Sequence, residues 1–168
     1  MAAGPPRMSF VDYDERYPAV FAELERRIRG VLPDVQVDHV GSTSVAGLPG
    51  RGVIDVVVVC PAARQPQAVQ ALHGIGLSDS PSAWIKPMLG GVIEHDGTAF
   101  RVLAYLLDAD HELRRGLLAT RDLLRSDPAE AARYAEVKRA ALAAGHNSPW
   151  AYQQAKTPYL ESLAERSG

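Results

Sequence analysis

The hydrophobic positions of the chain follow two different spacings, and these predict where helices and strands form. From Pro18 onward, apolar residues recur every three or four positions, at Phe21, Leu24, Ile28 and Val31. This spacing is typical of an amphipathic helix. The segment Val53–Cys60 is instead an apolar run rich in β-branched residues, interrupted by one charge. Such a run indicates a strand buried on both faces, because a half-exposed strand would alternate.

The middle of the chain adds further strands and a helix. Val35–Val40 predicts a short first strand, and Pro66–His73 predicts a short helix. Leu89–His95 and Thr98–Leu107 flank the dipeptide Asp96-Gly97, which is a strong hairpin signal. We therefore expect an α/β (α+β) fold, with a small mixed sheet of about four or five strands covered by helices.

The C-terminal part, about residues 110–165, is predicted to form a helical bundle that closes one side of a cleft. Its first helix has an apolar side of leucines and a polar stripe of three arginines, Arg114, Arg121 and Arg125. A second helix begins at Asp127, a good capping residue followed by Pro128, and should run to about Ala144. A third is expected after Ser148-Pro149 and must kink or restart at Pro158.

Composition limits the classes of protein that this chain can be. Its 168 residues suit one domain, expected at residues 9–168 after a flexible leader at residues 1–8. The net charge of −2 gives no overall attraction to nucleic acid or an anionic membrane, so a nucleic-acid partner is not expected. A single cysteine excludes an internal disulfide, and no apolar stretch is long enough to span a bilayer. We expect a cytoplasmic protein, of undetermined oligomeric state.

Candidate chemistry is concentrated between the first two strands. A helix beginning at Gly41-Ser42 would present unpaired backbone N–H groups and its positive dipole end to an anion, although Ser42 could equally be a plain helix cap. Asp55 is a carboxylate in a buried strand, so it either faces a site near the strand end or pairs with a buried base. His39, directly before the turn, is interpreted as a hydrogen-bonded structural residue.

These residues resemble a known family. His39 to Val45 reads HVGSTSV and is followed by Gly47-Leu48 and then by Ile54-Asp55, in the order and spacing of the GrpB-like family of the nucleotidyltransferase (polymerase-beta-like) superfamily. The C-terminal region is similar to the same family at a second set of positions: Arg121-Asp122, Leu124-Arg125, Pro128, Tyr134, Lys138, Tyr152 and Lys156. The likeness covers roughly residues 35–160 and is weak at residues 61–107.

The resemblance implies nucleotidyl transfer from a nucleoside triphosphate to an unknown small acceptor. It implies that Asp55 holds Mg²⁺ and acts with Ser42 as a catalytic residue. It further implies that the triphosphate is bound at Gly41, Ser42 and Thr43 and by Arg121, Lys138 and Lys156. The alternative for the cations is structural, with Arg121 paired to Asp55 or Asp122 and the lysines solvated.

Two departures, one from the wider superfamily and one from the GrpB-like family, favour a second interpretation. Strand geometry puts Val57 on the face of Asp55, where many nucleotidyltransferases carry a second carboxylate. The last strand, Phe100 to Leu107, also lacks the His-x-His pair that GrpB-like proteins often show. One carboxylate can still suffice, because Mg²⁺ is often held by one or two carboxylates with phosphates and water. The alternative is a non-catalytic module that binds a nucleotide or a phosphometabolite on the same fold.

Overall fold

The computed structural model describes residues 10–81, 83, 85–144, 158–159, 161–162 and 165. Within them, five strands form one mixed sheet in the order β1-β2-β5-β4-β3. The strands are β1 (Val37–Val40), β2 (Val53–Val59), β3 (Ser78–Asp79), β4 (Met88–His95) and β5 (Thr98–Leu107). Only β2 and β5 run parallel, and the other neighbours are antiparallel. The expected α/β class with a small mixed sheet is confirmed.

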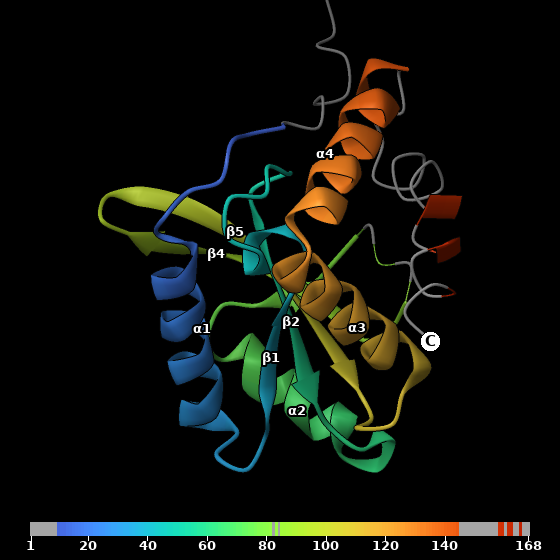
Figure 1. The fold of residues 1–168 in the computed structure, drawn as a ribbon. Helices are drawn as coiled ribbons and strands as arrows, with labels where there is room; N and C mark the ends of the chain where they lie inside the picture. The colour runs from blue at the N-terminus through green and yellow to red at the C-terminus, as the bar shows by residue number, and fades with distance from the viewer. Residues whose placement is uncertain are drawn as a thin grey trace, which may run out of the picture.

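The helices cover both faces of this sheet (Figure 1). The α-helices are α1 (Tyr17–Val31), α2 (Gln65–His73), α3 (Glu112–Ser126) and α4 (Pro128–Ala143), with single 3₁₀ turns η1 (Ser42–Ser44) and η2 (Ala62–Arg64). The predicted cap at the start of α4 is confirmed, because the side chain of Asp127 accepts hydrogen bonds from the backbone N–H groups of Ala129 and Glu130.

The apolar run of β2 divides between two cores, as expected for a strand buried on both faces. Ile54, Val56 and Val58 pack with the apolar sides of α1 and α2. Val57 belongs to the core on the opposite face, together with leucines of α3. A third, smaller core joins Val45 and its neighbours to α4. Period-two alternation therefore places Asp55 on the α3 side of the sheet.

The hairpin predicted at Asp96-Gly97 is confirmed. It joins β4 to β5, and both turn residues have positive φ, 49° for Asp96 and 75° for Gly97. Positive φ at both central residues gives the turn a backbone twist that matches the flanking strands.

One local prediction is wrong: no α-helix begins at Gly41-Ser42. The segment makes a single 3₁₀ turn and leaves it at Val45, whose backbone is extended (φ −116°, ψ 113°). The hydroxyl of Ser44 donates to the carbonyl of Gly41, a local bond of the kind that competes with helix formation. The predicted leader at residues 1–8 and most of the third C-terminal helix lie outside the described residues.

Candidate functional site

The turn between β1 and η1 depends on glycine at position 41. Gly41 has φ 75° and ψ −176°, a conformation open essentially to glycine alone. A side-chain carbon at this position would lie 2.4 Å from Oδ2 of Asp55. The backbone of the turn therefore approaches the carboxylate closely, because Asp55 pairs with Val40 across the β1–β2 ladder. Asp55 is half-buried, so it is not sealed within the core.

A buried polar chain supports the turn from beneath. The hydroxyl of Thr43 donates to the carbonyl of Val53 (3.1 Å), and Nε2 of His39 lies 2.9 Å from the same hydroxyl. Since the hydroxyl proton is used on Val53, Nε2 of His39 must be the donor. Burial, and then the charges of Arg125 and Arg121, lower the pKa of His39 to about 4. His39 is thus a neutral structural group, stacked on Phe21 with ring centroids 4.6 Å apart.

A buried lysine from α4 reaches the other side of the turn. Lys138 is 2% exposed, and its Nζ donates to the carbonyl of Pro49 (3.1 Å). A side-chain carbon at Gly50 would lie 2.2 Å from Oγ of Ser42 and 2.9 Å from Nζ of Lys138. The hydroxyl of Ser42 and the ammonium of Lys138 therefore both lie beside the Cα of Gly50, in the space that a side chain would fill. An ammonium this deeply buried needs acceptors, and the carbonyl of Pro49 is one of them.

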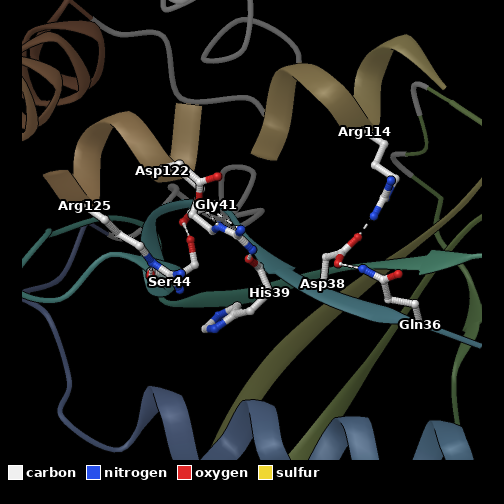
Figure 2. A network of polar contacts seen from close by, with 9 residues as sticks. Gln36, Asp38, His39, Gly41, Ser44, Arg114, Asp122 and Arg125 are labelled. Atoms are coloured by element: carbon white, nitrogen blue, oxygen red, sulfur yellow. Dashed lines mark hydrogen bonds and ion pairs between the residues drawn. The ribbon is translucent and has the colours of Figure 1, made fainter. Parts of the chain in front are cut away.

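Two arginines of α3 bind the backbone of the turn, and Figure 2 shows one of them, Arg125, beside Ser44. Arg121 donates from an NH group to the carbonyl of His39 (3.1 Å), and Arg125 donates from Nε to the carbonyl of Ser44 (2.8 Å). Arg121 also pairs with Asp122 at 2.9 Å, but that carboxylate is 62% exposed and adds little stability. The backbone on both sides of Gly41-Ser42 is thus fixed to one helix.

Arg125 was named in the arginine stripe and in the family pattern, but it was not among the predicted site residues. The signal that could have found it is its spacing of four residues from Arg121, which puts both guanidinium groups on one side of α3. Burial, and then the neighbouring charge of Arg121, lower the pKa of Arg125.

Arg114, at the other end of the arginine stripe, has a structural partner. Its Nε lies 2.9 Å from Oδ2 of Asp38, and both side chains are largely buried. Gln36 donates to the other oxygen of the same carboxylate at 2.8 Å (Figure 2). This network ties α3 to β1 away from the Gly41 turn.

The fit of Mg²⁺ to this site rests on Asp55. The described residues contain no group of three or more His, Cys, Asp or Glu side chains that could hold a metal. Val57, on the same face of β2, is fully buried in an apolar core and offers no oxygen. The space that the missing side chain of Gly41 leaves beside Oδ2 of Asp55 does suit an ion bound by one carboxylate plus substrate phosphates and water. Asp55 alone therefore does not make a Mg²⁺ site, and phosphate oxygens and water would have to supply the other ligands.

The structure brings some of the predicted site residues together and leaves others apart. Gly41, Ser42, Asp55 and Lys138 gather around the turn, and Arg121 binds its backbone. Thr43 is 2% exposed with its hydroxyl committed to the scaffold, so any contact with a phosphate would come from its backbone N–H. Lys156 lies outside the described residues.

Comparison with known proteins identifies the family of this chain. The chain matches the GrpB protein family over residues 7–166. It belongs to the GrpB family. A UPF0157 protein of Streptomyces coelicolor is 31% identical over 161 residues, which cover 94% of this chain and 82% of that protein. A UPF0157 protein of Halalkalibacterium halodurans is 30% identical over 165 residues, covering 95% and 82%.

Solved structures extend the likeness from this family to nucleotidyltransferase folds. The crystal structure of the conserved protein GrpB from Enterococcus faecalis has a TM-score of 0.73 at 22% identity, covering 95% of this GrpB chain and 96% of that one. A cytoplasmic RNA terminal U-transferase has a TM-score of 0.60 at 16% identity, covering 86% and 48%. Cid1 in complex with the UTP analogue UMPNPP has a TM-score of 0.53 at 19% identity, covering 89% and 45%. This chain spans about half of each transferase, and at these identities the likeness establishes the fold alone.

Across the described part of the chain, no helix combines the length and apolar character needed to cross a membrane.

Proposed function

We propose that this GrpB protein binds a nucleoside triphosphate with Mg²⁺ and transfers a nucleotidyl group to a small acceptor. The observation that carries the proposal is the meeting of the Gly41-Ser42 turn with the carboxylate of Asp55 and the buried ammonium of Lys138. This set joins an oxygen ligand of the kind Mg²⁺ prefers to a cation and a hydroxyl suited to phosphate. The fold likeness to Cid1, of which one structure holds MgGTP, supports the same chemistry.

In the proposed reaction, an oxygen of the acceptor attacks the α-phosphorus of the triphosphate. The bond from that phosphorus to the bridging oxygen of the β-phosphate breaks, pyrophosphate leaves, and the proton of the acceptor passes to water. Bound Mg²⁺ would neutralise phosphate charge and orient the phosphates. Asp55 holds the ion in this scheme, and Gly41, Ser42 and the backbone of Thr43 hold the triphosphate.

The positive groups stabilise the leaving pyrophosphate. Lys138 is held in one place by its bond to Pro49, so its charge is already positioned before the reaction begins. Arg121 keeps some of its five N–H donors after binding the carbonyl of His39 and the carboxylate of Asp122. We include Lys156 with them as a sequence prediction. Catalysis of this kind depends mostly on positioning and electrostatics.

A second candidate function is binding without catalysis. Its supporting observation is Val57, whose buried apolar side chain occupies the face of β2 where a second carboxylate would stand. A protein with one carboxylate could bind Mg²⁺ with a nucleotide or a phosphometabolite and release it unchanged. Measuring pyrophosphate release from each nucleoside triphosphate, with a panel of small hydroxyl and amine acceptors, separates the two functions.

The shared claim, a Mg²⁺-dependent triphosphate site at Asp55, is tested with Asp55→Asn. The wild-type protein should be stabilised against heat by ATP only when Mg²⁺ is present, and the variant should lose that response. A ligand at a hundred times its Kd stabilises the native state by about 2.7 kcal/mol. For a chain of this size, the midpoint should therefore rise by roughly 5 to 10 °C.

The control is Asp110→Asn, which removes the same charge from an exposed position beyond the opposite end of α3. It should keep the full magnesium-dependent shift. An unaltered shift in Asp55→Asn would refute the metal site. Collapse of the ligand-free Asp55→Asn protein would instead assign Asp55 to a structural ion pair.

A further inference from the structure

The α3 side of the sheet is only partly covered, and the cover ends beside Asp55. Toward the carboxyl ends of β2 and β5 this side is buried, because Val57 and Tyr105 pack with leucines of α3. Two residues nearer the start of each strand, Asp55 and Leu103 are only half-buried. They are partners in the parallel β2–β5 ladder, so they lie next to each other on the same side of the sheet.

The uncovered surface continues from Leu103 across β5 and β4. Arg101 is exposed and pairs with Val92, which is 60% exposed, and Leu103 pairs with Gly90. Paired residues share one side of a sheet, so these four positions form an open sheet face on the same side as Asp55. Arg101 also pairs with the β2 residue two positions before Asp55. Ordinary strand spacings then put the two Cα atoms about 8 Å apart.

The guanidinium of Arg101 makes no ion pair or hydrogen bond with any residue that the structure describes. Other arginines of the chain do have carboxylate partners, as Arg16 and Arg114 show. Glu94 lies diagonally across the β4–β5 ladder from Arg101, and the two form no ion pair. A single exposed arginine or valine is ordinary on a protein surface. What distinguishes this pair is its place on the side of the sheet that carries Asp55.

The order of the strands decides from which side an acceptor reaches the phosphorus. β2 lies between β1 and β5. The groups assigned to the leaving pyrophosphate lie on the β1 side, since Arg121 binds a carbonyl of β1 and Lys138 lies near Ser42 in the turn that follows β1. In an in-line displacement, the attacking atom approaches the phosphorus opposite the leaving group. The acceptor therefore comes from the β5 side, where the open sheet face lies.

We propose that the open sheet face binds the acceptor, and that the acceptor carries a carboxylate which pairs with Arg101. The inference rests on the proposed function and deepens it, because it names the class of acceptor. A guanidinium binds a carboxylate through two parallel hydrogen bonds, which fixes its orientation. Val92 and Leu103 offer apolar contact to the body of the acceptor. Gly90, beside both, adds no side chain that would fill the space.

The chemistry of the transfer is unchanged by this assignment. A hydroxyl oxygen of the acceptor bonds to the α-phosphorus, the bond to the bridging oxygen of the β-phosphate breaks, and pyrophosphate leaves. The hydroxyl proton passes to water. The carboxylate of the acceptor does not react, and Arg101 acts only by binding it, so Arg101 is a specificity residue for the acceptor.

The test uses pairs of hydroxyl compounds that differ by a carboxylate: glycerate with glycerol, and 4-hydroxyphenylacetate with 4-methylphenol. Binding is measured by saturation-transfer NMR on protein with Mg²⁺ and a non-hydrolysable ATP analogue, and transfer is measured as pyrophosphate release from ATP. In at least one pair the wild type should prefer the carboxylate. Arg101→Gln should weaken both binding and kcat/KM for that compound by about ten- to hundredfold, as expected for a lost hydrogen bond to a charged group.

Three controls separate a specific contact from a loss of charge or of fold. Arg115→Gln removes the same charge from an exposed position on α3 and should keep the preference for the carboxylate. Arg101→Lys keeps the charge without the planar fork and should restore part of the preference. The neutral compounds, the KM for ATP and the ligand-free unfolding midpoint should be the same in Arg101→Gln as in the wild type.

Loss of the preference in Arg101→Gln but not in Arg115→Gln supports the assignment. The assignment is overturned if the wild type binds no carboxylate compound or treats both members of each pair alike. It is also overturned if Arg101→Gln keeps the preference, or if Arg115→Gln loses it equally. In each of these cases a magnesium-dependent thermal shift with ATP, together with pyrophosphate release, leaves the proposed function standing. Absence of both the shift and the release refutes the proposed function as well.

Discussion

Replacing Gly41 by alanine tests whether the geometry of the turn creates the site. The change has two costs, and the structure gives each of them. The backbone conformation of Gly41 (φ 75°, ψ −176°) costs a non-glycine residue of order 1–3 kcal/mol. The new methyl group would lie 2.4 Å from Oδ2 of Asp55, so the carboxylate would have to move, which is a form of overpacking that typically costs about 1–3 kcal/mol.

Together these costs give an expected loss of at least about 2 kcal/mol, or roughly 4 to 8 °C in the unfolding midpoint. The displaced carboxylate should also abolish the magnesium-dependent stabilisation by ATP. Both quantities are measured in one thermal unfolding series, followed by circular dichroism, with and without Mg²⁺ and ATP. Strain alone would lower stability, whereas strain plus displacement of Asp55 should remove the ligand response as well.

Gly47→Ala supplies the comparison. Gly47 also has a positive φ, of 80°, but a side-chain carbon there would meet no atom within 4 Å. This variant should therefore lose about 1 kcal/mol from backbone strain and keep its response to ligand. The reasoning fails if Gly41→Ala is no less stable than Gly47→Ala, or if it binds ATP with Mg²⁺ as well as the wild type does.

Two further predictions concern the scaffold around the turn. Arg114→Ala should lower the free energy of unfolding in urea by about 3 kcal/mol, because it leaves the buried carboxylate of Asp38 without its cation, and a loss below 1 kcal/mol would contradict this. As the pH falls from about 6.5 to 4, the free energy of unfolding should decline by on the order of 3 kcal/mol. In this range His39 becomes protonated in the unfolded chain but stays neutral in the folded protein, where its pKa is about 4. His39→Gln should flatten this decline in pH-dependent urea titrations, and an unchanged slope would show that another group causes it.

Much of the architecture was already present in local patterns. The apolar run of β2, the spacing of α1, the Asp96-Gly97 hairpin and the Asp127 cap of α4 were all predicted, because each depends on neighbours a few residues apart. The wrong prediction of an α-helix beginning at Gly41-Ser42 has a cause in the hydroxyl groups of the same segment. Two hydroxyl groups there bond to backbone carbonyls, which ends the helix after one 3₁₀ turn, and the sequence alone does not say which competing bond wins.

The residues of the candidate site also differ in whether local sequence spacing could identify them. Sequence spacing identified Gly41, Ser42 and Asp55, since a turn and the strand that pairs back against it are brought together by one short connection. Lys138 was named only through the family resemblance, because its bond to the carbonyl of Pro49 joins positions 89 residues apart and has no local spacing to predict it. Tyr134 was likewise named in the family pattern, but its packing against Val45 and Leu48 is seen only in the structure.

The sequence by itself determined which segments form helices and strands, and it placed a glycine turn near a carboxylate. Periodicity, helix capping and turn glycines each depend on residues only a few positions apart. Only the tertiary structure decided which carbonyl the buried lysine of α4 binds and which arginines of α3 hold the turn. Those outcomes depend on how α3 and α4 pack across the sheet, and contacts between residues far apart in the chain leave no local pattern to read.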